Sequence, residues 1–239
     1  MEIDWRVSEV DLKKITDFVN QQSNVHVANR IARNINYQDL LINRDTMIHS
    51  LLYSMVLLNQ RHSIYPQIES VFQNNSSQFH YETIINVPDV KKYIFETLKK
   101  HGITVDINKS PEFFTNNFDL LESTNWVLLD ILTKNLYQKI DKQAEREIAD
   151  YVDTMFKGFG SIEARIFLQH LGLIKYEIPI DSVVSDWLNN FNFPIKLSTT
   201  ALQDRNYYHF VSDGIQLLCK KANVYPCVLE AAIHSYSMD

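Results

Sequence analysis

Glycine is scarce in this chain, and the scarcity limits the folds that the chain can form. Only five of the 239 residues are glycine, whereas sheet proteins place glycine in many of their tight turns. Apolar residues recur instead at helical spacing, as in Val10, Leu12, Ile15, Phe18 and Val19. The sequence therefore predicts an all-helical fold.

Helical patterns continue along almost the whole chain. Ser8 is the predicted N-cap of the first helix, Asp89 stands near the start of a later one, and Gly102 is the predicted C-cap of that later helix. Residues 74–89 lose the pattern and are expected to form a loop. The expected helices cover residues 7–22, 44–60, a segment that begins after residue 63, about 90–101, 118–138, 142–157, 161–171, 181–191, 204–222 and 226–236.

The apolar stretches and the start of the sequence indicate in which cellular compartment the protein is expected. The longest apolar stretch, residues 47–58, is shorter than the ~18 to 20 residues of a membrane span and contains His49. The start of the sequence has no basic segment followed by an apolar core, the pattern that indicates a signal peptide. We therefore expect a cytoplasmic protein without a membrane partner, and the length allows one long domain or two small ones.

The cysteines and the net charge restrict the cofactors and partners. Cys219 and Cys227 are expected to be buried free thiols, with a disulfide as the alternative, and two cysteines cannot supply the four thiolates of an iron–sulfur cluster. The net charge of −6 argues mildly against a nucleic-acid partner, because phosphate binding relies on Lys and Arg. Net charge does not describe a local basic patch, so composition alone leaves DNA binding open.

Two of the five glycines, Gly158 and Gly160, flank Phe159 in the middle of a helical pattern. Both can adopt the positive φ angles that other residues avoid, so they allow a very short turn between two helices. The N–H groups of Gly160, Ser161 and Ile162 would then begin the second helix near the positive end of its dipole. Such an end can bind a DNA phosphate. The alternative is a helical hairpin in which the glycines only permit the turn.

A carboxylate stands in an unexpected place downstream of the glycines. Asp181 lies within the apolar run "IPIDSVV" of residues 178–184. Aspartate is a common N-cap, so the simplest interpretation is that Asp181 caps the helix that follows it.

The two motifs together resemble the helix-hairpin-helix DNA glycosylase superfamily. Its hairpin is followed by a short helix, a loop and a hydrophobic-Pro-hydrophobic-Asp-x-x-Val segment, and Asp181 occupies the aspartate position of that segment. Ile162 aligns with the lysine of the bifunctional members, and Val183 stands where many members have histidine. Asn59 and Gln60 align with a polar wedge at the end of an earlier helix.

The resemblance implies an all-α, two-lobed helix-hairpin-helix DNA glycosylase fold with the active cleft between the lobes. Residues 1–44 and 186–239 would form one lobe, residues 45–185 would form the other, and the hairpin would cover about 148–171. The implied partner is double-stranded DNA that carries a damaged or modified base, bound by a monomer. No iron–sulfur cluster is expected, and a monovalent cation could bind at the hairpin.

The implied activity is that of a monofunctional DNA N-glycosylase. Cleavage of the bond between base and deoxyribose develops positive charge on the sugar, and Asp181 would stabilise that charge near C1′, a role that is compatible with capping. Ile162 has no amine to form a Schiff base, so lyase activity is expected to be absent. Gln60, with Asn59, would contact the orphaned base after the target nucleotide is flipped out.

The predicted DNA contacts come from three places in the chain. Lys157 and Arg165 could line the DNA backbone or could be ordinary solvated charges. The predicted DNA-binding residues are Gly158, Phe159, Gly160, Ser161 and Ile162 of the hairpin, Lys157 and Arg165 beside it, and Asn59 and Gln60 of the wedge.

Two alternative functions stay open. One is a non-catalytic DNA-binding protein of the same fold, and the other is a helical protein–protein adaptor.

Overall fold

The computed structural model describes residues 4–22, 24–38, 40–57, 64–103, 109–136 and 141–238 of the chain. These residues form helices and no strand, which confirms the predicted fold class. The elements are α1 (Glu9–Gln21), α2 (Val25–Arg30), the π-helix η1 (Ile31–Ile35), α3 (Arg44–Leu57), α4 (Tyr65–Asn74), the 3-10 helix η3 (Ser76–Phe79), α5 (Tyr81–Ile85), α6 (Val90–Lys100), α7 (Ser110–Ser123), α8 (Val127–Leu136), α9 (Lys142–Met155), α10 (Ser161–His170), α11 (Ser182–Phe191), the 3-10 helix η4 (Ala201–Gln203), α12 (Arg205–Lys221) and α13 (Pro226–Met238).

Side-chain caps fix where many of these helices begin. Ser8 caps α1 in a reciprocal capping box with Asp11, which confirms the predicted cap. The C-cap of α6 is His101, and the predicted cap residue Gly102 follows it with φ +75°, the left-handed conformation that glycine adopts without steric cost. Other helices begin with a side chain that accepts a backbone N–H: Asn24, Asp89, Asp141, Asp181 and Asp204.

The structure differs from the predicted secondary structure in two stretches of the middle of the chain. The helix expected over residues 118–138 is divided between α7 and α8, because Asn125 and Trp126 adopt positive φ angles of +49° and +60°. This turn places the Trp126 ring in the core, where it is 3% exposed. The expected loop at 74–89 contains η3 and α5, which bury Phe79 and Ile84 completely.

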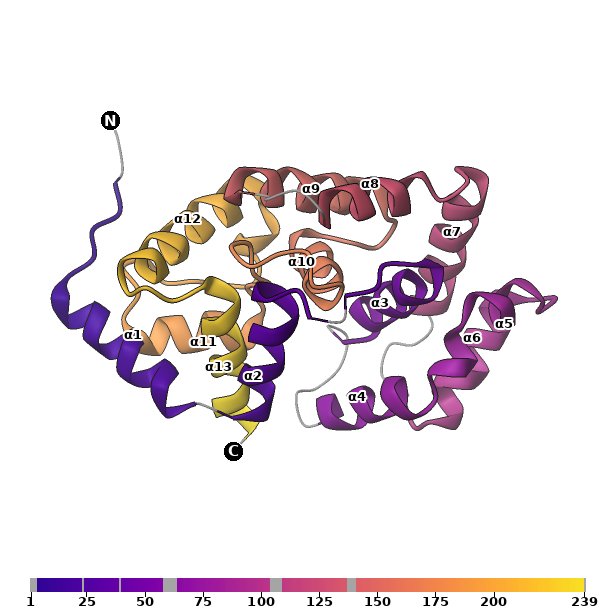
Figure 1. Ribbon diagram of the computed structural model, residues 1–239, viewed down its shortest axis with the longest axis horizontal. Helices are drawn as coiled ribbons and strands as arrows, with labels where there is room; N and C mark the ends of the chain where they lie inside the picture. Colours follow the sequence, from indigo (N-terminus) through magenta and orange to yellow (C-terminus); the bar gives the residue numbers. More distant parts are fainter. Residues whose placement is uncertain are drawn as a thin grey trace.

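The helices pack into two lobes, each around its own apolar core. Figure 1 shows α1, α2, α11, α12 and α13 on one side of the molecule and α3 to α8 on the other, with α10 between them. The terminal cluster contains Ile15 and Val27 from the beginning of the chain and Ile233 from its end, whereas the middle cluster extends from Met47 to Ile174. The terminal lobe is therefore built from both ends of the described chain.

The change from one cluster to the other falls between Ile174 and Ile178. It occurs earlier than the expected lobe boundary after residue 185, because Ile178 and Ile180 already pack in the terminal cluster. Ile162 on α10 packs against both clusters and so lies at their junction.

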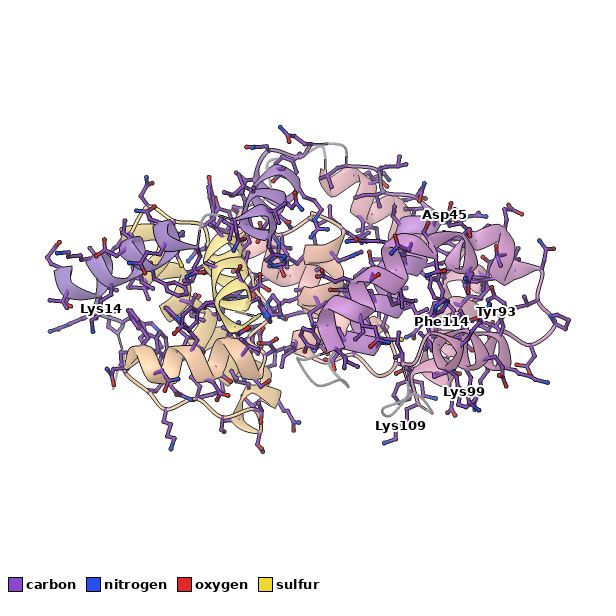
Figure 2. All side chains as sticks on the ribbon, turned by 90° about the horizontal axis from the view of Figure 1, so that it is seen from below. Lys14, Asp45, Tyr93, Lys99, Lys109 and Phe114 are labelled. Carbon is purple, nitrogen blue, oxygen red and sulfur yellow. The ribbon has the colours of Figure 1, made fainter. Side chains whose placement is uncertain are left out.

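The two lobes lie at opposite ends of the molecule. Figure 2 shows Lys14 of α1 at one end and Lys99 and Phe114 at the other.

Two further sequence features can be checked in the described residues. Cys219 and Cys227 are both buried and free, as expected. Among the described helices, none is both long and apolar enough to cross a membrane.

Candidate active site

The hairpin turn between α9 and α10 depends on one of its two glycines. Gly158 has φ +83°, and a Cβ built on it would lie 2.2 Å from Cδ2 of Phe113, so both conformation and space require glycine there. Gly160 has φ −135°, an extended angle that any residue can adopt. The expectation that both glycines use positive φ is therefore correct only for Gly158.

An asparagine from α7 holds the hairpin turn in place. The buried Asn117 accepts a hydrogen bond from Lys157 N through Oδ1 at 2.8 Å and donates one to Lys157 O through Nδ2 at 3.0 Å. The Lys157 backbone is fixed in this way while its side chain stays exposed. A cationic side chain is thus presented to solvent directly beside the turn.

The N-terminal end of α10 already has a carboxylate on it. Glu163 Oε2 accepts the Gly160 N–H at 3.0 Å, and the hydroxyl of the buried Ser161 donates to Asp153 Oδ2 at 3.3 Å. Burial raises the pKa of Glu163, and the nearby Asp153 adds to this rise. A phosphate that bound here would therefore compete with Glu163 for the Gly160 N–H.

The side chain of Phe159 is partly buried and packs against the middle cluster. Its ring lies 5.2 Å from the Phe156 ring and 6.0 Å from the Phe167 ring, and its N–H donates to Phe156 O at 3.2 Å. The ring therefore packs on neighbouring aromatic residues, and the N–H is used within the turn.

The prediction that Arg165 contacts DNA is wrong. Its side chain is completely buried, with Nη2 at 2.6 Å and Nε at 2.8 Å from Glu177 Oε2. The guanidinium also stacks on the Tyr208 ring at 4.5 Å. Burial alone would raise the pKa of Glu177, but the charges of Arg165 and Arg146 outweigh burial and hold that pKa below its usual value. Arg165 is a core residue because Glu177 compensates its charge.

The segment that leads from α10 to Asp181 is held by buried polar groups. The carboxylate of Glu145, on α9, accepts the three successive N–H groups of Lys175, Tyr176 and Glu177 at 2.7 to 3.1 Å. The hydroxyl of Tyr208 donates to Ile178 O at 2.7 Å and accepts from Ile180 N at 2.9 Å. These bonds fix the backbone directly before Asp181.

Asp181 is both a helix cap and a wall of the cavity. Its Oδ1 accepts the Val184 N–H at 2.9 Å at the start of α11, which confirms the capping role. Its Oδ2 lies 3.2 Å from Nε2 of His234, and the residue is 3% exposed. The charge of Asp181 also reaches Tyr65, whose pKa is raised first by burial and then by this carboxylate.

A set of charged side chains surrounds Asp181. His234 Nε2 lies 3.5 Å from Glu230 Oε1, one turn earlier on α13, and Arg30 Nη1 lies 2.5 Å from Glu230 Oε2. All four residues are nearly buried. Burial lowers the pKa of His234, but the charge of Asp181 and the hydrogen bond with it outweigh burial and raise that pKa to about 8. Opposite charges are thus paired around the predicted catalytic carboxylate.

The cavity at Asp181 has a volume of about 570 Å³ and lies between the lobes. Its middle-lobe wall carries a stack of rings: His170 lies 5.3 Å from His49 and 4.6 Å from Tyr53, with interplanar angles of 23° and 25°. On the terminal-lobe side, η1 is anchored by the buried Asn34, which donates to Gln169 O and Ile174 O. The residues that line the cavity are His26, Asn29, Arg30, Ala32, Arg33, Gln38, Leu40, His49, Tyr53, Leu57, Tyr65, Glu69, Phe72, Gln73, Ile166, Gln169, His170, Pro179, Asp181, Glu230 and His234.

Sequence reasoning missed much of this cavity. It gave no role to His234, Glu230 or Arg30, and no sequence motif links these residues to Asp181, because they lie on α13 and α2. The predicted wedge residues Asn59 and Gln60 lie outside the described residues. Asp181 is therefore the predicted site residue that the structure places at the cavity.

The fold recurs in a solved structure. The crystal structure of Methanocaldococcus jannaschii 8-oxoguanine glycosylase/lyase in complex with 15mer DNA containing 8-oxoguanine aligns with 93% of this chain and 94% of its own, with a TM-score of 0.68 and 17% sequence identity. No protein-family model matches the chain, and no curated protein matches it. The likeness shows that this chain has the two-lobed all-α fold of a helix-hairpin-helix DNA glycosylase.

Proposed function

We propose that this chain is a monofunctional DNA N-glycosylase that flips a damaged or modified base out of double-stranded DNA and excises it. The observation that carries the proposal is the place of Asp181, a buried carboxylate on the wall of a cavity of about 570 Å³ between the lobes. This volume is within the roughly 300–1,000 Å³ of typical small-molecule sites. The fold is shared with a glycosylase/lyase that was crystallised with DNA containing 8-oxoguanine.

Asp181 suits the electrostatic part of the reaction. The carboxylate is desolvated and held by Val184 N, so it does not have to reorganise when positive charge develops on the sugar. The cavity walls offer aromatic rings and hydrogen-bond donors, the two kinds of group that hold a flipped base.

The absence of lyase activity is part of the proposal. Ile162 stands where the bifunctional relatives have lysine, and it packs between the two cores. No lysine is found among the described residues that line the cavity. A Schiff base with the sugar needs an amine at this place, so we expect the product to be an intact strand with an abasic site.

The DNA would lie against the hairpin. Lys157 is exposed beside the turn, and the N-terminal end of α10 offers the Ser161 and Ile162 N–H groups, with that of Gly160 after Glu163 moves aside. The proposal thus keeps Lys157, Gly158, Gly160, Ser161 and Ile162 as the DNA-facing part of the hairpin.

The experiment is incubation of the protein with duplexes and genomic DNAs that carry different modified bases, followed by mass spectrometry of the released bases. We expect release of at least one free base, with strand cleavage only after alkali or an added lyase. Borohydride should trap no covalent adduct. Release of no base from any of these DNAs would refute the glycosylase activity, and a borohydride adduct would refute only the monofunctional subtype.

A further inference from the structure

His234 is the titratable cation that lies against Asp181. Its Nε2 is 3.2 Å from Asp181 Oδ2, and the whole residue is 6% exposed. The other charged or titratable groups around it are Glu230 on its own helix, and Arg30 and His26 on α2. Arg30 is engaged by Glu230, and an arginine does not give up its proton in a protein. His234 is thus an imidazole in contact with Asp181 that can both hold and give up a proton.

A departing base needs such a donor when it is uncharged. When the bond from C1′ to the base nitrogen breaks, its electron pair stays on the base, and an uncharged base would leave as an anion. Asp181 cannot supply a proton while it stabilises the sugar as a carboxylate. A general acid that protonates the leaving group typically accelerates such a step by roughly 10²- to 10⁴-fold.

We propose that the imidazolium of His234 donates a proton to the departing base, so that the chain acts on neutral bases and not only on bases that already carry a positive charge. This inference rests on the proposed glycosylase function and names its substrate class. A nucleotide with C1′ against Asp181 brings the nitrogens of its base close to the same imidazole, because the two side chains are in contact.

Protons and charge are conserved in this step. The proton on His234 Nε2 passes to a base nitrogen, the bond to C1′ breaks, and its electron pair remains on the base, which leaves neutral. Neutral His234 no longer offsets the charge of Asp181, so the carboxylate faces the cationic sugar at the moment when that charge develops. Water then adds to C1′ and loses one proton to His234, which restores the starting pair.

The protonation state of the free protein fits this role. The raised pKa of His234, about 8, leaves the imidazole charged at neutral pH. His26, the other histidine near the pair, has a pKa that burial and then Arg30 lower, so it is neutral there. The charged donor is therefore His234 and not His26.

The test compares two duplexes in single-turnover assays with wild type and His234→Gln. One carries 7-methylguanine, a cationic base that needs no proton in order to leave, and the other carries the neutral 8-oxoguanine. Glutamine keeps a hydrogen-bond donor for Asp181 but cannot give up a proton. We expect the variant to lose roughly 100-fold or more of its rate on 8-oxoguanine and less than about tenfold on 7-methylguanine. His80→Gln, at an exposed histidine, is the matched control and should leave both rates unchanged.

Each result decides the inference. Equal losses on the two substrates, a variant that keeps more than a tenth of its rate on the neutral base, or a wild type that releases only 7-methylguanine would overturn it and leave the glycosylase function in place. Release of no base from any duplex would remove both. An NMR titration of the His234 ring is the readout that does not depend on activity. The expected midpoint is near pH 8 in wild type and lower in Asp181→Asn, and a wild-type midpoint below that of a free histidine would also overturn the inference.

Discussion

Arg165 and Glu177 form an ion pair inside the protein, with Nη2 of Arg165 at 2.6 Å from Oε2 of Glu177 and both side chains fully buried. The pair connects α10 of the hairpin to the segment that leads to Asp181. It thereby ties the proposed DNA-binding element to the proposed catalytic one.

Removal of one partner of this pair should destabilise the fold. Arg165→Leu leaves the Glu177 carboxylate buried with Arg146 as its remaining cation, and such a loss typically costs about 3–5 kcal/mol. The free energy of unfolding in urea measures the effect. The double variant with Glu177→Leu should recover part of the loss. Unchanged stability together with weaker DNA binding would restore the surface role that the sequence predicted for Arg165.

Asp181→Asn should abolish base release while the fold and DNA affinity persist. Asparagine caps helices about as well as aspartate, so the start of α11 is preserved, while the negative charge is lost and the pKa of His234 falls with it. Loss of one such electrostatic group usually costs ~100-fold or more in rate. Single-turnover release on the best duplex, with a thermal melt as the control for folding, tests this. A variant with more than about a tenth of the wild-type rate would exclude Asp181 as the catalytic group.

The two hairpin glycines should respond differently to alanine. Gly158→Ala adds a Cβ at φ +83° against the Phe113 ring, and we expect a loss of about 1–3 kcal/mol in unfolding free energy from the strained backbone. Gly160→Ala has an extended backbone, with Glu163 Oε2 at 3.2 Å as the nearest contact of the added Cβ, so its cost should be smaller. Chemical denaturation of both variants decides the matter, and equal losses would contradict this account of the turn.

Glu163→Gln should tighten DNA binding. The carboxylate occupies the Gly160 N–H at the end of α10, where a phosphate is proposed to bind. Its replacement by a neutral amide removes the repulsion there. Lys157→Ala should do the opposite and reduce the salt slope of binding by about one. Fluorescence anisotropy between 50 and 200 mM salt measures the DNA affinity and its salt dependence for both variants. Identical affinities for wild type and the two variants would show that DNA does not bind at this end of the hairpin.

Stability should fall as the pH rises through the titration range of His234. Its pKa is about 8 in the folded protein against 6.5 for an unperturbed histidine, so the folded state binds the proton more tightly. The resulting stabilisation is fully present below pH 6.5, is lost as the pH passes 8, and amounts to about 2 kcal/mol. Unfolding free energies at pH 6 and pH 9 for wild type and His234→Gln measure it. The difference between the two proteins should shrink across this range, and a constant difference would disprove the linkage.

Local sequence patterns predicted the parts of the site that depend on neighbouring residues. The turn at Gly158, the cap at Asp181 and most helices follow from spacing within a few residues. Elements that depend on distant partners were missed. The start of α5, for example, is fixed by Asp45 Oδ1, which accepts the Tyr81 N–H at 2.7 Å across 36 positions. The contact of His234 with Asp181 is of this second kind.

The same limit explains the error at Arg165. An arginine next to a hairpin motif looks like a DNA contact when its environment is unknown. Its burial depends on Glu177, twelve positions later, and on the Tyr208 ring, and neither follows from the motif. The helical period predicted α10 itself but could not reveal which polar side chain had a partner in the core.

The construction of the terminal lobe from both ends of the chain has a consequence during translation. Helix α2 packs against α13, and α13 carries both His234 and Glu230. The ribosome therefore synthesises Asp181 well before His234, which lies against it, and before Glu230, which lies against His234. A nascent or prematurely terminated chain would have the aspartate without its histidine and a cavity that lacks one wall, so the proposed activity would have to wait until α13 has emerged.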